Sequence, residues 1–361
     1  MPNRKLTVSP LMPLLMPLIA VALAVVGCAP RMVLDPEGVG IIRTYQFSST
    51  VADPQPAWNP QSDVLVVRSL NGFGLLQEGR GRQEYFDSVE SRQTWFPAWI
   101  NRGQFVFGPQ RNVIALGDGR VVASTDGLSL VNVLDNGLKC EITRDQLSPI
   151  GFGPRPAGEV VYAQVDDTMI VIDQSAKRSD AGQGFAPEPQ VGGPGICWRD
   201  VPLGEPDHWQ GKGGRGTLFI RWKPGQLTEV PGGCQARWTA DGGVVCTVMR
   251  AVPTDTKPWW TGGTDVVYLS GPDVSPVVVA KDCRSPAPHP SEPLVAVADG
   301  AAGVSLVSLR TPPTAPQLLT AIGGAPLWNH DGSRLLAVDQ SQDGQPAVIT
   351  VYVLKETRTT L

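Results

Sequence analysis

The sequence predicts an all-β protein, and three observations support this prediction. Its 361 residues include 40 Gly and 34 Pro, about a fifth of the chain, and both residue types break helices. Short apolar runs bounded by turn residues recur along the chain at intervals of roughly 40–50 residues. One more apolar run stands near the N-terminus, ahead of the first recurring motif. Together these observations predict a β-propeller of four-stranded blades that an N-terminal strand closes.

Each copy of the repeat has a proline or small residue and an aromatic residue, then a polar turn and an apolar run. We expect the aromatic side chain to fill the space between neighbouring blades. The polar residues favour a tight turn, and the apolar run favours a strand inside a stacked sheet. The clear copies begin at Pro56, Pro97 and Pro326, the looser ones at Pro149, Ala236 and Pro286, and a weaker one is centred on Trp198.

The spacing of the copies predicts the number of blades. The positions 58, 99, 152, 198, 238, 288 and 328 are separated by 41, 53, 46, 40, 50 and 40 residues. Most copies are followed by two further apolar runs, such as 304–307 and 317–320, so each repeat supplies four strands. The Gly- and Pro-rich stretch 180–216 leaves two alternatives, seven blades if it contains one and six if it is an insertion. The even steps favour seven.

The first and last apolar runs predict how the ring closes. Residues 41–47 precede the first motif, at the place where every other repeat has its outer strand. Residues 348–354 end the chain as a third strand. We therefore expect the N-terminal strand to complete the last blade, which removes an exposed sheet edge. Since no linker divides this region, we expect one propeller domain over 40–361.

The turn motifs resemble those of a known family. Trp328-Asn-His-Asp-Gly, and less closely Trp58-Asn-Pro, is similar to the Pro-x-Trp-Ser-Pro-Asp-Gly-like turn of TolB-type and WD-repeat-like propellers of bacterial cell envelopes. Asn329 and His330 stand where that pattern has Ser and Pro. The resemblance covers 40–361 as periodicity and rests on six or seven short motifs. It implies a propeller that docks protein partners, although propellers carry many unrelated activities.

The N-terminal residues have the pattern of an export signal. Arg4 and Lys5 are basic, and no acidic residue occurs before Asp35. The nine-residue apolar run Leu18–Val26 is too short to span a bilayer as a helix. It ends in Val25-Val26-Gly27-Cys28, which resembles the bacterial lipobox, whose cysteine is diacylated and becomes the mature N-terminus.

We therefore expect a lipoprotein signal peptide at 1–27, a lipidated tether at 28–39 and a membrane anchor on Cys28. The alternative is an ordinary signal peptide with an unmodified Cys28. Nothing after residue 28 is long and apolar enough to be transmembrane. Lipidation would place the protein on the outer surface of the inner membrane, or on the outer membrane if the organism has one. Ala29 favours the outer membrane under the enterobacterial sorting rule.

The other cysteines predict at most two disulfides, because five is an odd number and an exported chain meets oxidising conditions. Cys234 and Cys283 each precede a first strand, so we expect them to pair across neighbouring blades. Cys140 and Cys197 could pair by default, which leaves Cys246 as a buried thiol. We expect no Cys234–Cys246 bridge, because a turn at 241–242 would put Cys246 opposite about Arg237 and too far from Cys234. The alternative is that all five are buried, reduced thiols.

Composition and motifs argue against several classes of function. With 30 Lys and Arg against 34 Asp and Glu, the net charge of −4 does not suit a nucleic-acid binder. Three histidines leave little material for a metal or acid–base site, and no serine-hydrolase elbow, phosphate loop or metal-binding motif occurs. We interpret Asp166-Asp167 as solvated hairpin residues and His289 and His330 as structural turn residues. We expect no catalytic residue, metal or cofactor.

Two loops contain the candidate binding residues. His208 and Trp209 lie in the fourth repeat, and Trp259 and Trp260 lie in the fifth. Both loops would connect second to third strands of neighbouring blades and so emerge on the same face. The tryptophans could then form a platform that stacks on sugars, peptide aromatics or a partner protein. The alternative is that they fold back over the blade edge.

Three classes of function are compatible with these features. The favoured one, which the family resemblance implies, is a lipid-anchored, non-enzymatic envelope scaffold that docks protein partners. The second is a module that binds a glycan or another small ligand through Trp209, Trp259 and Trp260. The third is an enzyme such as a glycosidase or lyase, which would need carboxylates, or His208 with acids, facing the central channel.

Overall fold

Residues Ile41–Leu354 form one compact unit in the computed structural model. All residues that the structure describes lie in this unit. No helix in this described part is long and apolar enough to cross a membrane. The described residues are 41–51, 54, 56–59, 61–70, 72–79, 81–86, 98–101, 104–107, 112–115, 121–123, 129–133, 139–143, 161–165, 168–172, 178–190, 193–201, 215–251, 263–299, 303–310, 317–320, 325–339 and 345–354.

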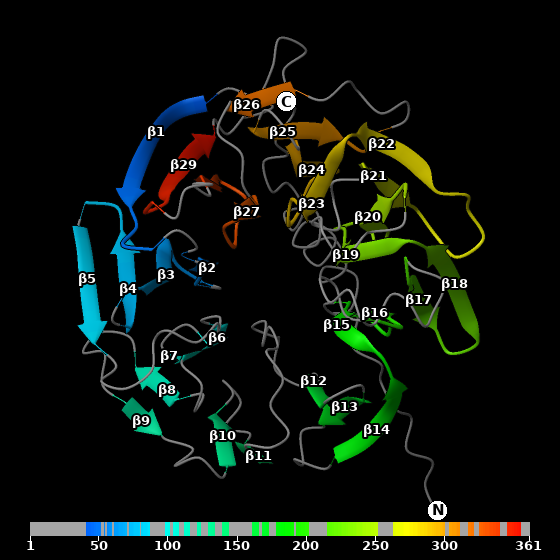
Figure 1. The fold of residues 1–361 in the computed structure, drawn as a ribbon, viewed down its shortest axis with the longest axis horizontal. Coiled ribbons are helices and arrows are strands. Elements are labelled where there is room, and N and C mark those ends of the chain that lie inside the picture. The colour runs from blue at the N-terminus through cyan, green and yellow to red at the C-terminus, as the bar shows by residue number, and fades with distance from the viewer. Residues whose placement is uncertain are drawn as a thin grey trace, which may run out of the picture. The chain divides into compact units, whose positions relative to one another are not determined.

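The elements of the described residues are all β-strands, and chain neighbours pair antiparallel into eight sheets (Figure 1). The sheets are β2–β5 (Ala57–Trp58, Val64–Ser69, Gly72–Gln77, Gly81–Phe86), β6–β9 (Ala98–Asn101, Gln104–Phe107, Asn112–Ala115, Val121–Ala123), β10–β11 (Ser129–Val133, Lys139–Thr143), β12–β14 (Val161–Val165, Thr168–Ile172, Arg178–Gln183), β15–β18 (Phe185–Pro189, Ile196–Arg199, Thr217–Lys223, Gln226–Pro231), β19–β22 (Gly233–Trp238, Val244–Met249, Thr264–Leu269, Val277–Lys281), β23–β26 (Cys283–Pro288, Leu294–Asp299, Gly303–Ser308, Gln317–Thr320) and β27, β28, β29 and β1 (Leu327–Trp328, Arg334–Asp339, Val348–Leu354, Ile41–Ser48).

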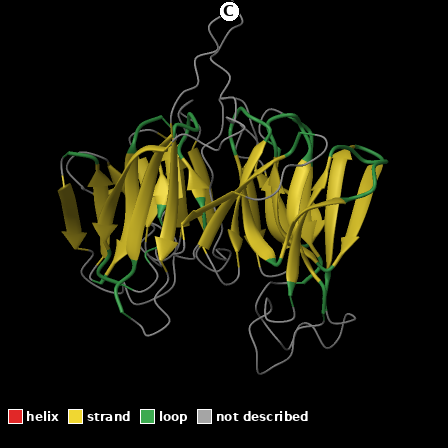
Figure 2. Ribbon diagram, turned by 90° about the horizontal axis from the view of Figure 1, so that it is seen from above, coloured by secondary structure: helices red, strands yellow, loops and turns green. Residues whose placement is uncertain are grey.

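The sheets of this unit follow one another around a ring in chain order, as a β-propeller requires (Figure 1). First strands of neighbouring sheets contact each other, as β19 does with β15 and β23. The strands run between two faces (Figure 2). We call the face where second strands lead into third strands the loop face. The opposite one, with the turns between first and second and between third and fourth strands, is the turn face.

The predicted number of seven blades does not match the eight sheets that the described residues form. The prediction counted aromatic motifs, and two sheets lack the expected signal. The sheet β10–β11 falls inside the 53-residue step and has no aromatic residue to mark it. Trp198 lies on β16, which is the second strand of its sheet and not the first. The stretch 180–216 supplies strands of the sheet β15–β18, so it is more than an insertion.

The predicted ring closure is confirmed. β1 pairs antiparallel with β29 from Ile41 opposite Leu354 to Ser48 opposite Val348, and it forms the outer strand of the last sheet. The inward side chains of β1 join the apolar layer between the last sheet and the first. There Tyr45 and Phe47 pack edge to face against each other, with ring centroids 5.4 Å apart. About 300 residues therefore separate the two partners of one ladder.

The core lies between sheets, since each interface is filled by side chains from two neighbours. The interface between β15–β18 and β19–β22 contains Ile220 and Val244, both with 0% exposure. The next interface contains Val266 and Val295, again fully buried. Strands β20, β24 and β28 are nearly continuous apolar runs because both of their faces are covered.

Tryptophans on the first strands connect neighbouring sheets, as predicted, although they are half-buried and not fully buried. The indole Nε1 of each one described donates to a backbone carbonyl of the preceding first strand. Trp58 donates to Leu327 at 3.2 Å and Trp328 to Ala287 at 2.9 Å. Trp238 donates in the same way to Glu188 at 3.0 Å. Trp99 lies on β6, and its side chain is outside the described residues.

The predicted disulfides are absent, because Cys197, Cys234, Cys246 and Cys283 are buried free thiols. Cys234 on β19 packs between the sheets β15–β18 and β19–β22, whereas Cys283 on β23 packs between the sheets β19–β22 and β23–β26. The two thiols therefore lie on opposite sides of the sheet β19–β22. Cys197 is free, which excludes the bridge to Cys140 on β11. Cys234 stands opposite Thr247, because a bulge shifts the register that the sequence suggested. The thiols are therefore core residues.

Candidate functional site

The two loops with the candidate residues join the strands that the sequence predicted. Residues 202–214, with His208 and Trp209, connect β16 to β17, and residues 252–262, with Trp259 and Trp260, connect β20 to β21. These are second and third strands of neighbouring sheets, so both loops leave from the loop face. The four candidate side chains lie outside the described residues. The described residues at the ends of the loops show how the loop bases are held.

Arg199 and Asp200, just before the first loop, bond to the residues just after it. Arg199 is 2% exposed, and it donates from Nε to the Gly233 carbonyl at 2.9 Å and from Nη2 to the Arg215 carbonyl at 2.8 Å. Asp200 accepts the Thr217 backbone N–H at 2.7 Å. These contacts join the two ends of the loop to each other and to the next sheet.

Arg215 joins the bases of the two loops. Its Nη1 donates to the carbonyls of Met249 at 3.2 Å and Arg250 at 3.3 Å, where the second loop begins. The backbone of Gly232 adds two bonds, donating to the Gly216 carbonyl at 2.7 Å and accepting from Met249 at 3.0 Å. The loop bases therefore lie side by side, and we call Arg199, Arg215 and Arg250 the arginine framework.

Arg250 extends the arginine framework to a third sheet. It forms ion pairs with Asp282, which precedes β23, and with Asp265 at 3.9 Å. Its backbone N–H donates to the Gly263 carbonyl at 3.0 Å, which closes the base of the second loop. Because Asp282 is 70% exposed, this ion pair orients the loop base more than it stabilises the fold.

Two residues with strained backbone angles lie on the first strands β19 and β23, next to the arginine framework. Gln235 and Ser285 have positive φ angles of 50° and 51°, which non-glycine residues rarely adopt, at the bulges of β19 and β23. The Gln235 carboxamide bridges the two strands, donating to Ser285 Oγ at 3.1 Å and accepting the Ser285 N–H at 2.9 Å. Thr247 donates to the same carboxamide oxygen at 3.0 Å. Such strain persists only where surrounding contacts fix it.

A buried thiol packs beneath the same loop bases. Cys234 lies with Val201 and Met249 in an apolar cluster, and burial raises the pKa of this thiol to about 12. Burial also lowers the pKa of the neighbouring Arg199. The Arg199 Nη1 atom has no hydrogen-bond partner among the described residues. A protonated thiol of this kind is a packing group and not a nucleophile.

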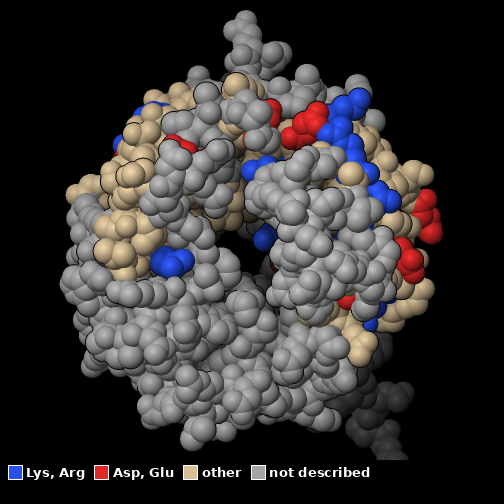
Figure 3. Space-filling view, viewed as in Figure 1, with Lys and Arg blue, Asp and Glu red and all other residues tan. Residues whose placement is uncertain are grey.

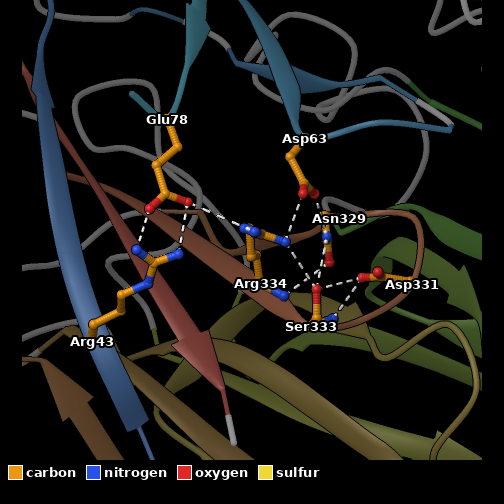
Figure 4. A network of polar contacts seen from close by, with 7 residues as sticks. All are labelled: Arg43, Asp63, Glu78, Asn329, Asp331, Ser333 and Arg334. Atoms are coloured by element: carbon orange, nitrogen blue, oxygen red, sulfur yellow. Dashed lines mark hydrogen bonds and ion pairs between the residues drawn. The ribbon is translucent and has the colours of Figure 1, made fainter. Parts of the chain in front are cut away.

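A second polar network lies on the turn face, where the last sheet meets the first (Figure 4). Arg334 on β28 pairs with Asp63 at 2.7 Å and with Glu78 at 3.7 Å, and Glu78 also pairs with Arg43 on β1. Asn329 donates to Asp63 at 2.9 Å. This network joins four segments of the closing seam, so its role is structural.

The described histidines have the structural placement that the sequence predicted. His289 is 3% exposed, its Nδ1 accepts the backbone N–H groups of Ser291 and Glu292, and its Nε2 donates to the Gly332 carbonyl at 3.1 Å. Gly332 has a φ of +78°, and a Cβ there would overlap the His289 ring, so only glycine fits. His330 is an exposed turn residue. Asp166 and Asp167 lie between β12 and β13, outside the described residues.

One face of the described surface has charges of both signs. Lys and Arg lie beside Asp and Glu along the rim near β18 and β22 (Figure 3). Within the described ranges, no group of three or more His, Cys, Asp or Glu could hold a metal ion.

Sequence reasoning identified the loops but missed the arginine framework. Arg199, Arg215 and Arg250 are irregularly spaced and meet only when the sheets pack. A usable signal was that each stands within three residues of the end of a long polar loop. Arginine donors suit this position, because one guanidinium can reach carbonyls from two sheets.

Comparisons with known proteins establish the fold. No protein-family model matches the chain, and no curated protein sequence does. Virginiamycin B lyase from Staphylococcus aureus is 8% identical with a TM-score of 0.54, over 87% of this chain and 99% of that one. The β-propeller domain of Cps50 (Swd1) from Myceliophteria thermophila is 11% identical with a TM-score of 0.53, over 87% and 100%. YCF48 bound to a D1 peptide is 9% identical with a TM-score of 0.51, over 88% and 100%. Identities this low show the β-propeller fold alone.

Proposed function

We propose that this protein is a lipid-anchored, non-enzymatic scaffold of the bacterial cell envelope whose loop face docks a protein partner. The observation that carries the proposal is the contact between the bases of two tryptophan-containing loops, 202–214 and 252–262, on neighbouring sheets. Arg215 connects these bases through the carbonyls of Met249 and Arg250. Loops on a rigid scaffold are the usual location of binding residues, and tryptophans are enriched at the centres of interfaces.

The resemblance of the turn motifs to TolB-type envelope propellers supports the same proposal. YCF48, one of the similar structures, is bound to a peptide in its solved structure. His289 is enclosed by backbone groups and cannot reach a substrate. The anchor is Cys28 in Val25-Val26-Gly27-Cys28, which holds the propeller on the membrane.

The docking role is tested by crosslinking the lipidated protein in its native membrane and identifying what is captured. The variant Trp209→Ala/Trp259→Ala/Trp260→Ala should lose the captured protein at least about tenfold, as expected for removal of aromatic hot spots. Lys223→Ala is the matched control, because Lys223 is exposed on the turn face. A partner captured equally by all forms would refute the assignment of the loop face. A captured glycan in place of a protein would favour the binding-module alternative.

The anchor is tested separately by the mass of the N-terminal peptide. We expect a peptide that begins at Cys28 and carries acyl chains. Cys28→Ser should give a soluble or unprocessed protein. A native N-terminus downstream of residue 28 without lipid would refute the anchor.

A further inference from the structure

The exposed aliphatic side chains of the propeller gather on one edge. Of the eight large hydrophobic side chains that are exposed among the described residues, seven lie at the beginning of an outer strand or in the turn before it. All seven are therefore on the rim of the turn face. We call them the aliphatic belt: Ile41, Ile42, Leu227, Val274, Val277, Val278 and Leu318, which are 38–62% exposed.

The aliphatic belt recurs at the same position of four consecutive sheets. Its residues come from β18, β22, β26 and β1, which are the outer strands of four consecutive sheets along the rim in Figure 1. Val277 and Val278 are adjacent on β22, where side chains of a strand should alternate between faces, and yet both are exposed. Both faces at the beginning of this strand are therefore partly exposed, although it is paired with β21.

The chain enters the propeller within this belt. β1 begins at Ile41, and the segment 1–40, with the apolar run Leu18–Val26 and Cys28, precedes it directly. A tether over 28–40 can extend about 45 Å at most, so an anchored Cys28 keeps this edge near the bilayer. A linker of this length gives the belt a high effective concentration at the lipid surface.

We propose that the aliphatic belt contacts the lipid bilayer, so that the propeller sits with its turn face on the membrane and its loop face directed away. This inference rests on the lipid anchor of the proposed function and adds the orientation. Scattered aliphatic side chains bind lipid weakly by themselves, but a chain anchor needs only one such second contact. The orientation presents the loops 202–214 and 252–262 to a partner outside the membrane.

The test is depth-dependent quenching of a fluorophore on the full lipidated protein in phosphatidylcholine–phosphatidylglycerol vesicles containing spin-labelled phosphatidylcholine. One label is attached through Val278→Cys and the matched label through Leu70→Cys, both in a Cys140→Ala background. Leu70 is the eighth exposed side chain, 62% exposed in the turn between β3 and β4 on the loop face. The four described native thiols are buried and do not compete for the label.

We expect at least about threefold more quenching at 278 than at 70, because the belt enters the headgroup region. Val277→Asp combined with Leu227→Asp should abolish the quenching at 278, whereas Lys281→Asp, at the exposed loop-face end of the same strand β22, should leave it unchanged. Equal quenching at both positions, or none at either, would overturn the inference. The mass of the N-terminal peptide is measured on the same sample. An acylated peptide with unquenched labels refutes the belt alone, and an unacylated peptide refutes the anchor and the belt together.

Discussion

Single side chains hold the propeller together by reaching the backbone of a neighbouring sheet. Trp58, Trp238 and Trp328 each donate an indole N–H to a first-strand carbonyl. At the loop face, the Arg199 guanidinium donates to Gly233 on the first strand β19, and the Arg215 guanidinium donates to Met249 on the second strand β20. These side chains thus bond to the backbone of a neighbouring sheet with which their own sheet shares no ladder. Apolar packing and hydrogen bonding thus come from the same residues.

Trp328 provides a quantitative test at this scale. It packs edge to face on His289, with centroids 4.7 Å apart, and donates to Ala287. Trp328→Ala should lower the free energy of unfolding by about 3 kcal/mol, at the low end for core aromatics because the ring is half-buried. Trp328→Phe should cost about 1–2 kcal/mol, since it keeps an aromatic ring but removes the hydrogen bond and part of the packed indole. Denaturant unfolding measures both, and equal losses for the two variants would contradict this division.

His289 should make the stability dependent on pH. Burial lowers the pKa of His289 below its ordinary value of 6.5, while the Gly332 carbonyl and Asp331 oppose this shift. The unfolded chain therefore binds the proton more readily, and the stabilising contribution is present above pH 6.5 and lost as pH falls below it. A single group changes the unfolding free energy by at most about 1.4 kcal/mol per pH unit.

The measurement is denaturant unfolding between pH 7.5 and pH 5, compared with His289→Gln. Both proteins share His208, His330 and the carboxylates, so the difference in slope isolates His289. Asp331 and Glu292 are the acidic residues beside the ring, and Trp328 covers its face. A steeper fall for His289→Gln than for the native protein would reverse the sign and disprove the assignment.

At the scale of elements, the sequence predicted the first strand of a sheet correctly where a tryptophan lies on that strand. The tryptophans mark β2, β6, β19 and β27, and the turn residues after them are correctly placed. The count of sheets failed because β10–β11 has no such marker. The disulfide prediction failed because Cys234 on β19 and Cys283 on β23 each face the preceding sheet, so the sheet β19–β22 lies between them. Equivalent positions on neighbouring sheets therefore do not face each other, and the spacing of the cysteines alone does not reveal this.

The closing seam offers a second test at this scale. Arg334 is 18% exposed and pairs with Asp63, so removing one partner leaves a partly desolvated charge. Asp63→Asn and Arg334→Gln should each cost about 1–2 kcal/mol, and the double variant about 1 kcal/mol less than their sum. The control cycle uses Glu188 and Arg237, which pair at 3.1 Å with side chains 35% and 48% exposed. Its coupling should stay below about 0.5 kcal/mol, because solvent screens an exposed pair.

The whole molecule depends on one ladder between the two ends of the described unit. β1 and β29 are adjacent in space, and the ring closes only when the chain between them has folded. The same strand begins on the turn face, while the tryptophan loops leave from the loop face. The fold thus separates the proposed anchor from the proposed docking site. A chain whose last strand alone completed the last sheet would leave β29 as an open, apolar edge.

Detaching β1 should therefore open the ring. Phe47→Asp puts a charge into the apolar layer that contains Leu336 and Ile349, both 0% exposed, and this layer cannot accommodate it. Thr44→Asp adds the same charge to the same strand on its exposed side. We expect Phe47→Asp to lower the midpoint of thermal unfolding by about 5 °C or more, about 3 kcal/mol or above, and to cause self-association through the freed edge of β29. Thr44→Asp should change neither property. Calorimetry measures the midpoint of thermal unfolding, and light scattering measures self-association. If both variants behaved alike, the ladder between β1 and β29 would contribute nothing to the ring, and closure by β1 would be contradicted.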